Sequence, residues 1–441
     1  MSAEDSQFVQ WLRSVAPYIH AHRGKVFVVA ISGELIASGR LNGLVQDVAL
    51  LAAMGVRIVL VHGFRPQIEA QLREKGVNSL FSHGMRVTDE VALDAAQEAA
   101  GQLRFEIEAT FSQGLPNTPM AGATVRVVSG NFITARPVGV IDGLDFQHTG
   151  LVRKVDAPTI QRALEYGAVV LAPPFGFSPT GEAFNLSMED VASSVAAALK
   201  ADKLIVLTEV AGVTGEDGRM LSELTVEQAE RLLAQLADPQ QPSDTASYLR
   251  HALRALHAGV GRAHIVGFEQ DGSLLLELFT HDGVGTMIAD EHLEHLRQAT
   301  SDDVGGILQL IEPLEDEGVL VKRDRTEIER DIGNYTVLEH DGVIFGCAAL
   351  YPYPERRTGE MAALTVAASA QEQGDGERIL RRIEQQARAL RLESIFVLTT
   401  RTMHWFLKRG FVPVDPDWLP EARRQRYDDQ RRSRVLVKRL G

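Results

Sequence analysis

The sequence predicts two α/β units in tandem: a three-layer unit on a mainly parallel sheet, followed by a smaller α+β unit. The 441 residues exceed one ordinary core, so two or three domains are expected. Over the first two-thirds, apolar runs alternate with helical stretches, as in a parallel sheet covered by helices on both faces. After about residue 290 this alternation changes to a hairpin followed by mixed strands and helices.

The first unit begins with apolar runs at 26–31 and 57–62 that predict buried strands, and the segment 41–54 between them has helical periodicity. We expect further strands at 124–128, 168–172, 203–207 and 263–266, helices at 92–113, 157–166, 188–199 and 248–258, and a polar loop at 237–247. Ahead of them an apolar stripe (Phe8, Trp11, Leu12, Val15) is interrupted by Pro17. The stripe either docks on the domain or forms an oligomer contact.

The second unit follows a charged stretch, which gives predicted domains 1–288 and 297–441 with a linker at 289–296. We expect helices at 302–314 and 325–332, a hairpin of strands 336–339 and 343–350, a strand at 359–366, a helix at 376–390, a strand at 394–398, a helix at 403–409 and a strand at 435–437.

Composition limits the class of protein. A net charge of −14 argues against general nucleic-acid binding, which depends on clustered Lys and Arg. The single cysteine, Cys347, allows no internal disulfide and favours a reducing compartment. No apolar stretch is long enough to span a membrane, and no secretory signal is visible. We therefore expect a soluble cytoplasmic protein without nucleic-acid or membrane partners.

The last 21 residues depart from this acidity. They hold seven arginines and one lysine against three acidic residues, a local charge of +5. This tail is either a solvated end or a segment held in place by the strand at 435–437.

A glycine motif precedes the helix at 376–390. Gln371, Gly374 and Gly376 form a Q-x-x-G-x-G pattern, and closely spaced glycines before a helix let backbone N–H groups converge on an anion. This pattern resembles the acetyl-CoA loop of the GNAT acetyltransferases. Asp375 would place a carboxylate beside the phosphates, so we expect its side chain to point outward.

The resemblance covers nearly all of 297–441, and it is closest to the bacterial N-acetylglutamate synthase family. It rests on the segments 347–352, 359–362, 374–378, 397–402, 405–406, 409–411 and 431–433. It implies acetyl transfer from acetyl-CoA to L-glutamate, without a metal, as the opening step of arginine biosynthesis.

The residues 20–288 resemble the amino-acid kinase family, through 61–63, 184–187, 207–213, 277–280 and 283–286. The family's two phosphate-binding lysines would fall at Ala30 and near Tyr248. Phosphoryl transfer depends on positive charge against the phosphates, so we expect a kinase fold without kinase activity. Phe64 and Arg65 after Gly63 would also crowd a phosphate.

The resemblance further implies feedback by L-arginine bound in this domain. Glu277, His264, Gly283 and the segment around Tyr18 match effector positions. A guanidinium requires a carboxylate partner. Alternatively, His264 is a satisfied strand-edge histidine and Glu277 a solvated helix carboxylate. A homo-oligomer, hexameric by resemblance, is also expected.

In the acetyltransferase domain, the resemblance places the general base at Glu360. Backbone amides from Leu364 to Val366 would hold the cofactor arm. The tyrosine common in GNAT enzymes is replaced by Phe406, which leaves Thr399 as the hydroxyl candidate, or as an ordinary strand residue.

Arg323 and Arg431 match positions that bind the substrate carboxylates in this family; otherwise they are surface arginines. His292 and His295 would share a helix face without completing a metal site, and Cys347 is expected to be a buried strand residue. The alternatives to the synthase are N-acetylglutamate kinase, a non-catalytic arginine sensor and acetylation of another amine.

Overall fold

The computed structural model describes residues 3–114, 116, 118–123, 125–215, 218–236, 242–280, 282–290, 295–340, 343–367, 374–428 and 430–440. The chain divides into two compact units, 1–292 and 293–441. Their topologies confirm the predicted order: an α/β unit on a mainly parallel sheet, then an α+β unit.

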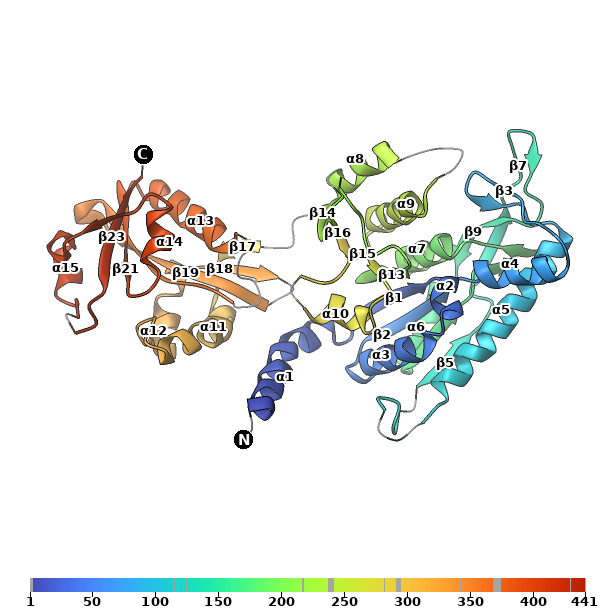
Figure 1. The fold of residues 1–441 in the computed structure, drawn as a ribbon, viewed down its shortest axis with the longest axis horizontal. Coiled ribbons are helices and arrows are strands. Elements are labelled where there is room, and N and C mark those ends of the chain that lie inside the picture. The colour runs from blue at the N-terminus through green and yellow to red at the C-terminus, as the bar shows by residue number, and fades with distance from the viewer. Residues whose placement is uncertain are drawn as a thin grey trace. The chain divides into compact units, whose positions relative to one another are not determined.

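An eight-stranded sheet forms the centre of the first unit (Figure 1). Its order is β14 (Glu223–Thr225), β16 (Thr286–Ala289), β15 (Arg262–Gly267), β13 (Lys203–Thr208), β1 (Val26–Ile31), β2 (Arg57–His62), β10 (Ala168–Ala172) and β5 (Arg126–Ser129). The paired strands are parallel except at β15–β16, where they are antiparallel. The predicted strands of this sheet are therefore confirmed, with ends shifted by up to two residues.

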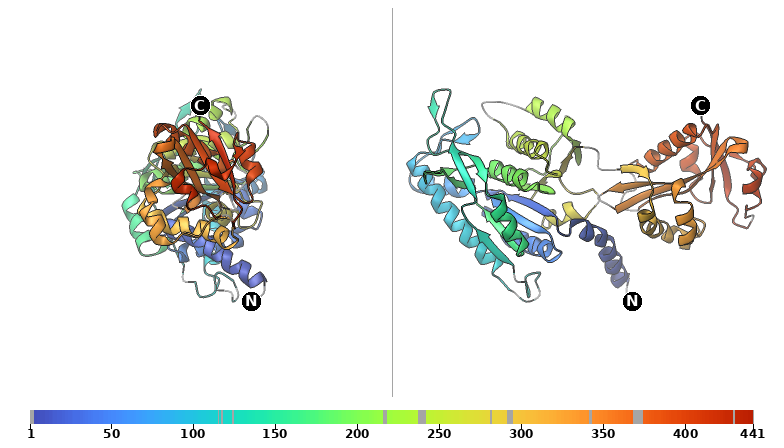
Figure 2. Two further views of the ribbon diagram at one scale, coloured as in Figure 1. Left: turned by 90° about the vertical axis from the view of Figure 1, so that its left-hand side faces the viewer. Right: turned by 180° about the vertical axis from the view of Figure 1, so that it is seen from behind.

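Helices cover both faces of this sheet (Figures 1 and 2). Side chains alternate along each strand, so Val28 and Ala30 pack on one side while Phe27 and Val29 pack on the other. The first face is covered by α6 (Ala157–Glu165), α7 (Met188–Leu199), α8 (Val226–Leu236) and α9 (Asp244–His257). The second is covered by α2 (Gly33–Ala37), α3 (Leu41–Ala53), α4 (Arg65–Glu74), α5 (Glu90–Phe111) and α10 (Ser273–Phe279).

A smaller four-stranded sheet of this unit was not predicted. Its order is β12 (Ala183–Asn185), β11 (Phe175–Phe177), β6 (Ile133–Pro137) and β9 (Gly150–Val155). Two short hairpins accompany it, β3 (Phe81–Ser82) with β4 (Met85–Arg86) and β7 (Val140–Ile141) with β8 (Leu144–Asp145). These strands are short and partly exposed, so they lack the long apolar runs that mark the central sheet.

Two expectations for the first unit were wrong. The N-terminal helix α1 (Ala3–His22) continues through Pro17, so the proline does not interrupt it. The helix α9 begins at Asp244 because the Ser243 hydroxyl accepts from the Ala246 N–H and caps it, so the polar loop does not extend to residue 247. Residues 237–241 of that loop lie outside the described residues.

The second unit has a seven-stranded sheet. Its order is β17 (His295–Gln298), β18 (Tyr335–His340), β19 (Val343–Tyr353), β20 (Thr358–Val366), β21 (Ser394–Thr399), β23 (Arg434–Arg439) and β22 (Val412–Val414). The β18–β19 hairpin was predicted and is confirmed. The helix face proposed for His292 and His295 was wrong for His295, which begins a strand; His292 lies outside the described residues.

Helices lie on both faces of this sheet as well. One face packs on α13 (Asp375–Ala389) and α14 (Met403–Leu407), and the other on α11 (Val304–Asp316) and α12 (Arg325–Arg330). A short helix, α15 (Glu421–Arg424), precedes β23, and short 3₁₀ turns lie at Ser301–Asp303, Ile332–Asn334, Pro354–Arg356 and Pro416–Trp418. The predicted strand in the basic tail is confirmed, since β23 pairs with β21 and β22.

Candidate functional site

The sheet of the second unit opens between β20 and β21. These parallel strands pair only from Thr358 to Glu360, although β20 continues to Val366. On its other side β20 stays paired with β19 up to Val366. Past Glu360, within the described part of the chain, the backbone of residues 361–365 is not paired with β21, so this side of β20 is a candidate edge for a ligand. Leu364 and Val366, the residues expected to hold a cofactor arm, lie along this stretch.

A β-bulge shapes the same stretch. The pairing of β19 with β20 shifts between Cys347 and Ala349, and the extra residue on β20 lies at Ala363–Leu364. Ala363 has φ = 52°, in the left-handed region, which costs an alanine on the order of 1 kcal/mol. Bulges often redirect backbone groups next to active sites. The strain at Ala363 thus marks the backbone around Leu364 as a candidate binding edge.

Glu360 lies where the pairing between β20 and β21 ends. Its side chain is 11% exposed, and its Oε2 accepts from the Arg423 Nε at 2.6 Å. The Tyr353 hydroxyl lies 3.5 Å from the same oxygen. Burial and the Glu360 charge raise the pKa of Tyr353 to about 12, so the phenol keeps its proton at neutral pH. A partly buried carboxylate with an oriented oxygen can take up a proton from a bound amine.

Two more guanidinium groups lie in the second unit. Arg431 donates to the carbonyl of Val319 at 2.6 Å and to that of Gly318 at 3.2 Å. Arg323 donates its backbone N–H to Glu315. Burial lowers the pKa of Arg431, and the charges of Arg323 and Arg423 lower it further. The structure therefore brings Arg323 and Arg423 into electrostatic range of Arg431, and Arg423 also forms an ion pair with the carboxylate of Glu360.

The remaining predicted groups near this opening have local partners. Thr399 ends β21, and its hydroxyl lies 2.8 Å from that of Thr402. Among the described contacts none joins Thr399 to Glu360. Phe406 is a core residue, with ring centroids 5.2 Å from Phe411. Cys347 is fully buried in β19, as expected, and burial raises the pKa of its thiol to about 12. This thiol is not a nucleophile at neutral pH.

The glycine loop is described only from Gly374 onward; Gln371 lies outside the described residues. Gly374 is the N-cap of α13 with φ = 91°, a conformation that glycine adopts without steric cost. A Cβ at Gly376 would come 3.1 Å from the Trp405 ring, so a side chain there would need the ring to shift slightly. Gly374 therefore permits the left-handed N-cap, and Gly376 permits the close approach of the helix start to Trp405 of α14.

The expected orientation of Asp375 was wrong. Its side chain is buried, 1% exposed, and lies 3.4 Å from Arg378 one turn further along α13. A carboxylate in the first turn of a helix is stabilised by the helix dipole, which holds Asp375 inward against the helix. The carboxylate does not project into solvent.

Four other predicted residues gather around α10 in the first unit. Glu277 is 3% exposed; its Oε1 lies 2.7 Å from His264 Nδ1, and its Oε2 accepts from the backbone N–H groups of Val284 and Gly285. Gly283 has φ = 60°, and a Cβ there would collide with the Glu277 carboxylate. Glu277 is therefore not a solvated helix carboxylate.

The charges of this cluster follow from burial. Burial lowers the pKa of His264 to about 4, so the ring is neutral and donates through Nδ1 to the ionised Glu277. Burial alone would raise the pKa of Glu277, but His264 and the two backbone N–H groups lower it below its usual range. Tyr18 of α1 packs edge-on against Phe279 at the end of α10, 6.3 Å between ring centroids. The N-terminal helix thus reaches the same segment as Glu277.

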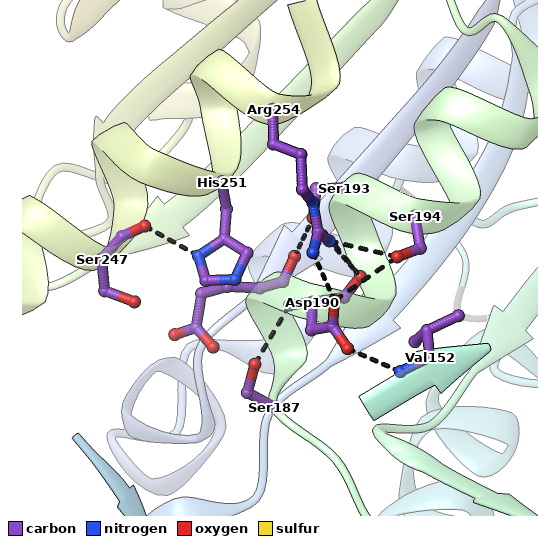
Figure 3. Close-up of polar contacts among 9 residues, drawn as sticks. Val152, Ser187, Asp190, Ser193, Ser194, Ser247, His251 and Arg254 are labelled. Atoms are coloured by element: carbon purple, nitrogen blue, oxygen red, sulfur yellow. Dashed lines mark hydrogen bonds and ion pairs between the residues drawn. The ribbon is translucent and has the colours of Figure 1, made fainter. Parts of the chain in front are cut away.

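A cavity of about 360 Å³ lies in the first unit, outside the carboxyl ends of β1, β2 and β13. Ligands of parallel α/β sheets commonly bind at this edge. One wall is fixed by the ion pair between Arg254 of α9 and Asp190 of α7, at 2.6 Å, and the Asp190 carboxylate also accepts from the Val152 N–H of β9 at 2.7 Å (Figure 3).

The two positions that match the phosphate-binding lysines of amino-acid kinases, Ala30 and Tyr248, hold residues without a positive charge. Ala30 is fully buried in β1. The hydroxyl of Tyr248 lies against Thr208, with 2.8 Å between the oxygens, and burial with the nearby charge of Glu189 raises the pKa of Tyr248. Phe64 lines the cavity and packs into the core. Neither position therefore supplies positive charge for a γ-phosphate, although Arg65, Arg86, Arg250 and Arg254 line the same cavity.

Two residues near Glu360 were not predicted. Arg423 belongs to the basic tail, whose local charge of +5 was the signal for it, but no spacing connects position 423 with position 360. Tyr353 ends β19, next to the turn that leads into β20.

Within the described ranges, no group of three or more His, Cys, Asp or Glu side chains is arranged to hold a metal ion. Nor is any helix there long and apolar enough to cross a membrane.

Two family models match the chain. Residues 25–267 match the amino acid kinase family, and residues 307–411 match the acetyltransferase (GNAT) family. Curated amino-acid acetyltransferases are similar over the whole length. The protein of Ralstonia nicotianae is 61% identical over 99% of this chain and 96% of its own length, and that of Azotobacter vinelandii is 48% identical over 98% and 99%.

Solved structures agree with these matches. N-acetylglutamate synthase from Neisseria gonorrhoeae, complexed with coenzyme A and L-arginine, is similar with a TM-score of 0.84 and 41% identity, over 98% of this chain and 99% of that one. The same enzyme complexed with coenzyme A and N-acetyl-glutamate matches over the same shares with a TM-score of 0.62.

Proposed function

The chain belongs to the amino-acid acetyltransferases, and on that premise we propose that it transfers the acetyl group of acetyl-CoA to the α-amino group of L-glutamate. The products are N-acetyl-L-glutamate and coenzyme A. One observation carries the choice of substrate: the 41% identity, over 98% of the chain, to a synthase whose structures hold coenzyme A with L-arginine or N-acetyl-glutamate. This reaction opens arginine biosynthesis, and L-arginine is its feedback inhibitor.

In the proposed reaction Glu360 accepts a proton from the substrate ammonium, directly or through a water. The free amine attacks the thioester carbonyl, the new C–N bond forms and the C–S bond breaks without an acyl-enzyme. The attacking nitrogen gives up its second proton as the amide forms, and the leaving thiolate takes one up, with Thr399 as the hydroxyl candidate for the donor, so that coenzyme A leaves as the thiol. Arg323 and Arg431 bind the carboxylates of glutamate, because a guanidinium offers two parallel N–H donors to each. Arg431 would exchange its present carbonyl partners for the substrate.

The cofactor would lie along the open edge of β20. Backbone N–H groups between Leu364 and Val366 support the pantetheine arm and polarise the thioester carbonyl. The pyrophosphate would lie at the glycine loop, Gln371 to Gly376, where the N-terminus of the 15-residue helix α13 attracts negative charge.

We assign the first unit a regulatory role. L-Arginine would bind around α10, with its guanidinium at Glu277 and with Tyr18, His264 and Gly283 around it. The contacts among these residues support one continuous site. Kinase activity is not expected, because Ala30 and Tyr248 bring no charge to the phosphates. We also propose a cytoplasmic homo-oligomer, in which Trp11 and Leu12 on the exposed part of α1 contact another copy.

A thiol-release assay tests the proposal. The protein is mixed with acetyl-CoA, free thiol is followed with and without L-glutamate, and L-arginine is then added. Glutamate-dependent thiol release that arginine inhibits is the expected result. Thiol release with another amine but not with glutamate would contradict the substrate. Consumption of ATP in the presence of N-acetyl-L-glutamate would instead favour the kinase, and no turnover with arginine binding would favour a sensor.

A further inference from the structure

Arg423 lies directly against the proposed general base. It comes from α15, and its Nε is 2.6 Å from Glu360 Oε2; both side chains are largely buried, with exposed fractions of 16% and 11%. The Nη1 of Arg423 donates to the Arg426 carbonyl at 3.2 Å, which fixes the guanidinium plane. An ion pair held by a second hydrogen bond and shielded from solvent has a defined geometry.

The two carboxylate oxygens of Glu360 differ in their hydrogen bonds. Oε2 is the acceptor of Arg423, and the Tyr353 hydroxyl lies 3.5 Å from it. Among the described residues no hydrogen bond reaches Oε1. An ionised carboxylate can accept on both oxygens. The structure thus holds one oxygen in place and leaves the other free to receive a proton.

The positive charge of Arg423 also affects the protonation of the substrate amine beside Glu360. A lone carboxylate beside a bound ammonium would stabilise the ammonium, and a protonated amine cannot attack the thioester. With Arg423 in contact, the Glu360 group is close to neutral overall. The other charged or titratable groups nearby are Tyr353 on β19, Arg426 beyond α15, whose charge also acts on Tyr353, and Arg431, whose pKa is lowered by burial and by the charges of Arg323 and Arg423. The positive charge of Arg423 disfavours a bound ammonium, but it also disfavours a proton on Glu360, so the expected effect on kcat comes mainly from the orientation of the carboxylate.

We propose that Arg423 is a positioning residue for acetyl transfer, which orients Glu360 through Oε2 and favours the neutral form of the substrate amine. This inference rests on the proposed function. It distinguishes Arg423 from Arg323 and Arg431, whose proposed partners are the substrate carboxylates. Arg423 is therefore expected to affect the rate of the chemical step and not the affinity for glutamate.

The test compares Arg423→Gln, Arg423→Lys and the control Arg424→Gln in the full-length protein. Arg424 lies on the same short helix and pairs with Asp417 at the surface, at 3.8 Å. For Arg423→Gln we expect kcat with glutamate to fall roughly 10- to 100-fold while the KM values for glutamate and acetyl-CoA stay within about twofold. Lysine keeps the charge without the planar fork, so Arg423→Lys should recover to within about fivefold of wild type. Arg424→Gln should equal wild type.

The outcomes separate this inference from the function on which it rests. If wild type shows no glutamate-dependent thiol release, the proposed function and the inference both fail. If wild type is active and Arg423→Gln keeps its kcat, only the role of Arg423 fails. A large rise in the KM for glutamate at unchanged kcat would make Arg423 a substrate ligand and overturn positioning. Loss of acetyl-CoA binding in both the glutamine and lysine variants would show a folding role, which also overturns it.

Discussion

Glu277 in the first unit and Glu360 in the second are both buried carboxylates, but their oxygens are used differently. Both oxygens of Glu277 are occupied, one by His264 and the other by two backbone N–H groups. Among the described residues, hydrogen bonds reach Glu360 on Oε2 alone, from Arg423 and, at 3.5 Å, from Tyr353. A fully bonded carboxylate fixes the protein around it, whereas a half-bonded one can exchange a proton. The comparison separates a carboxylate that is held on both oxygens by the protein from one that keeps an oxygen for proton exchange.

The change with the largest expected effect removes the proton acceptor. In Glu360→Gln we expect kcat to fall about 10³-fold, ~4 kcal/mol, because an amide cannot take the ammonium proton. The KM for acetyl-CoA and the affinity for arginine should stay unchanged. Steady-state thiol release with Glu355→Gln, an exposed carboxylate five residues earlier, provides the control. A glutamine variant that retains most of its kcat would remove Glu360 from the chemistry.

Acid should weaken the first unit. Burial lowers the pKa values of His22, His62 and His264 to about 4, so the unfolded chain takes up these protons first as the pH falls from about 6.5 towards 4. Between pH 7.5 and 5.5 each histidine costs roughly 1 kcal/mol. Burial lowers the pKa of Lys203 to about 7, which adds roughly 1 kcal/mol to this loss, and it raises the pKa of Asp47 to about 7, which offsets roughly 2 kcal/mol. A net loss of about 2 kcal/mol remains.

Hydrogen exchange at the two pH values, followed separately in the two units, measures this difference. Amides of the central strands in the first unit should lose protection at pH 5.5, after correction for the intrinsic rate. His264→Asn should reduce the pH dependence, since one of the three protons is removed. Equal protection of the first unit at both pH values would contradict the buried neutral state of these rings.

The substrate carboxylates supply the next test. Arg431→Ala should raise the KM for glutamate roughly 30-fold, about 2 kcal/mol, since a charge-assisted hydrogen-bond pair is lost. The KM for acetyl-CoA should change less than about twofold. Arg424→Ala, a surface arginine of the same tail, serves as the control. Equal changes in both KM values would indicate that Arg431 acts by tying the tail to Val319.

The smallest expected effect concerns Glu277. Glu277→Ala should weaken the arginine response about 10-fold, because a hydrogen bond to a charged group is lost, while kcat without arginine stays within about twofold. Arginine titration of the thiol assay measures both quantities. Glu269→Ala, an exposed carboxylate of the same unit, is the matched control. An unchanged arginine titration would show that Glu277 only anchors Val284 and Gly285.

Much of the secondary structure was predictable because its signal is local. The strands 168–172 and 203–207 and the helix 188–199 were found from apolar periodicity, since burial alternates along a strand and follows the turns of a helix. The absence of the two kinase lysines at positions 30 and 248 could also be predicted, because the neighbouring segments resemble those of the amino-acid kinase family. The four-stranded sheet was missed because its short, partly exposed strands carry little of this signal.

The side-chain environment was less predictable. Pro17 lies within α1, and the Asp375 carboxylate is buried instead of pointing outward. Both errors came from local rules, that proline ends a helix and that a carboxylate prefers solvent. In the folded chain, the docking of α1 on α10 and the dipole of α13 with Arg378 outweigh those preferences.

The amino-acid sequence by itself determined the order of elements, the division into an α/β and an α+β unit, and the residue types available at each candidate site. Only the tertiary structure decided which groups meet. Arg423 contacts Glu360, which is 63 positions away in the sequence. His264 of the strand β15 contacts Glu277 of the helix α10, which is 13 positions away. The physical reason is that periodicity is a property of neighbouring residues, whereas the partner of a buried charge depends on how distant segments pack.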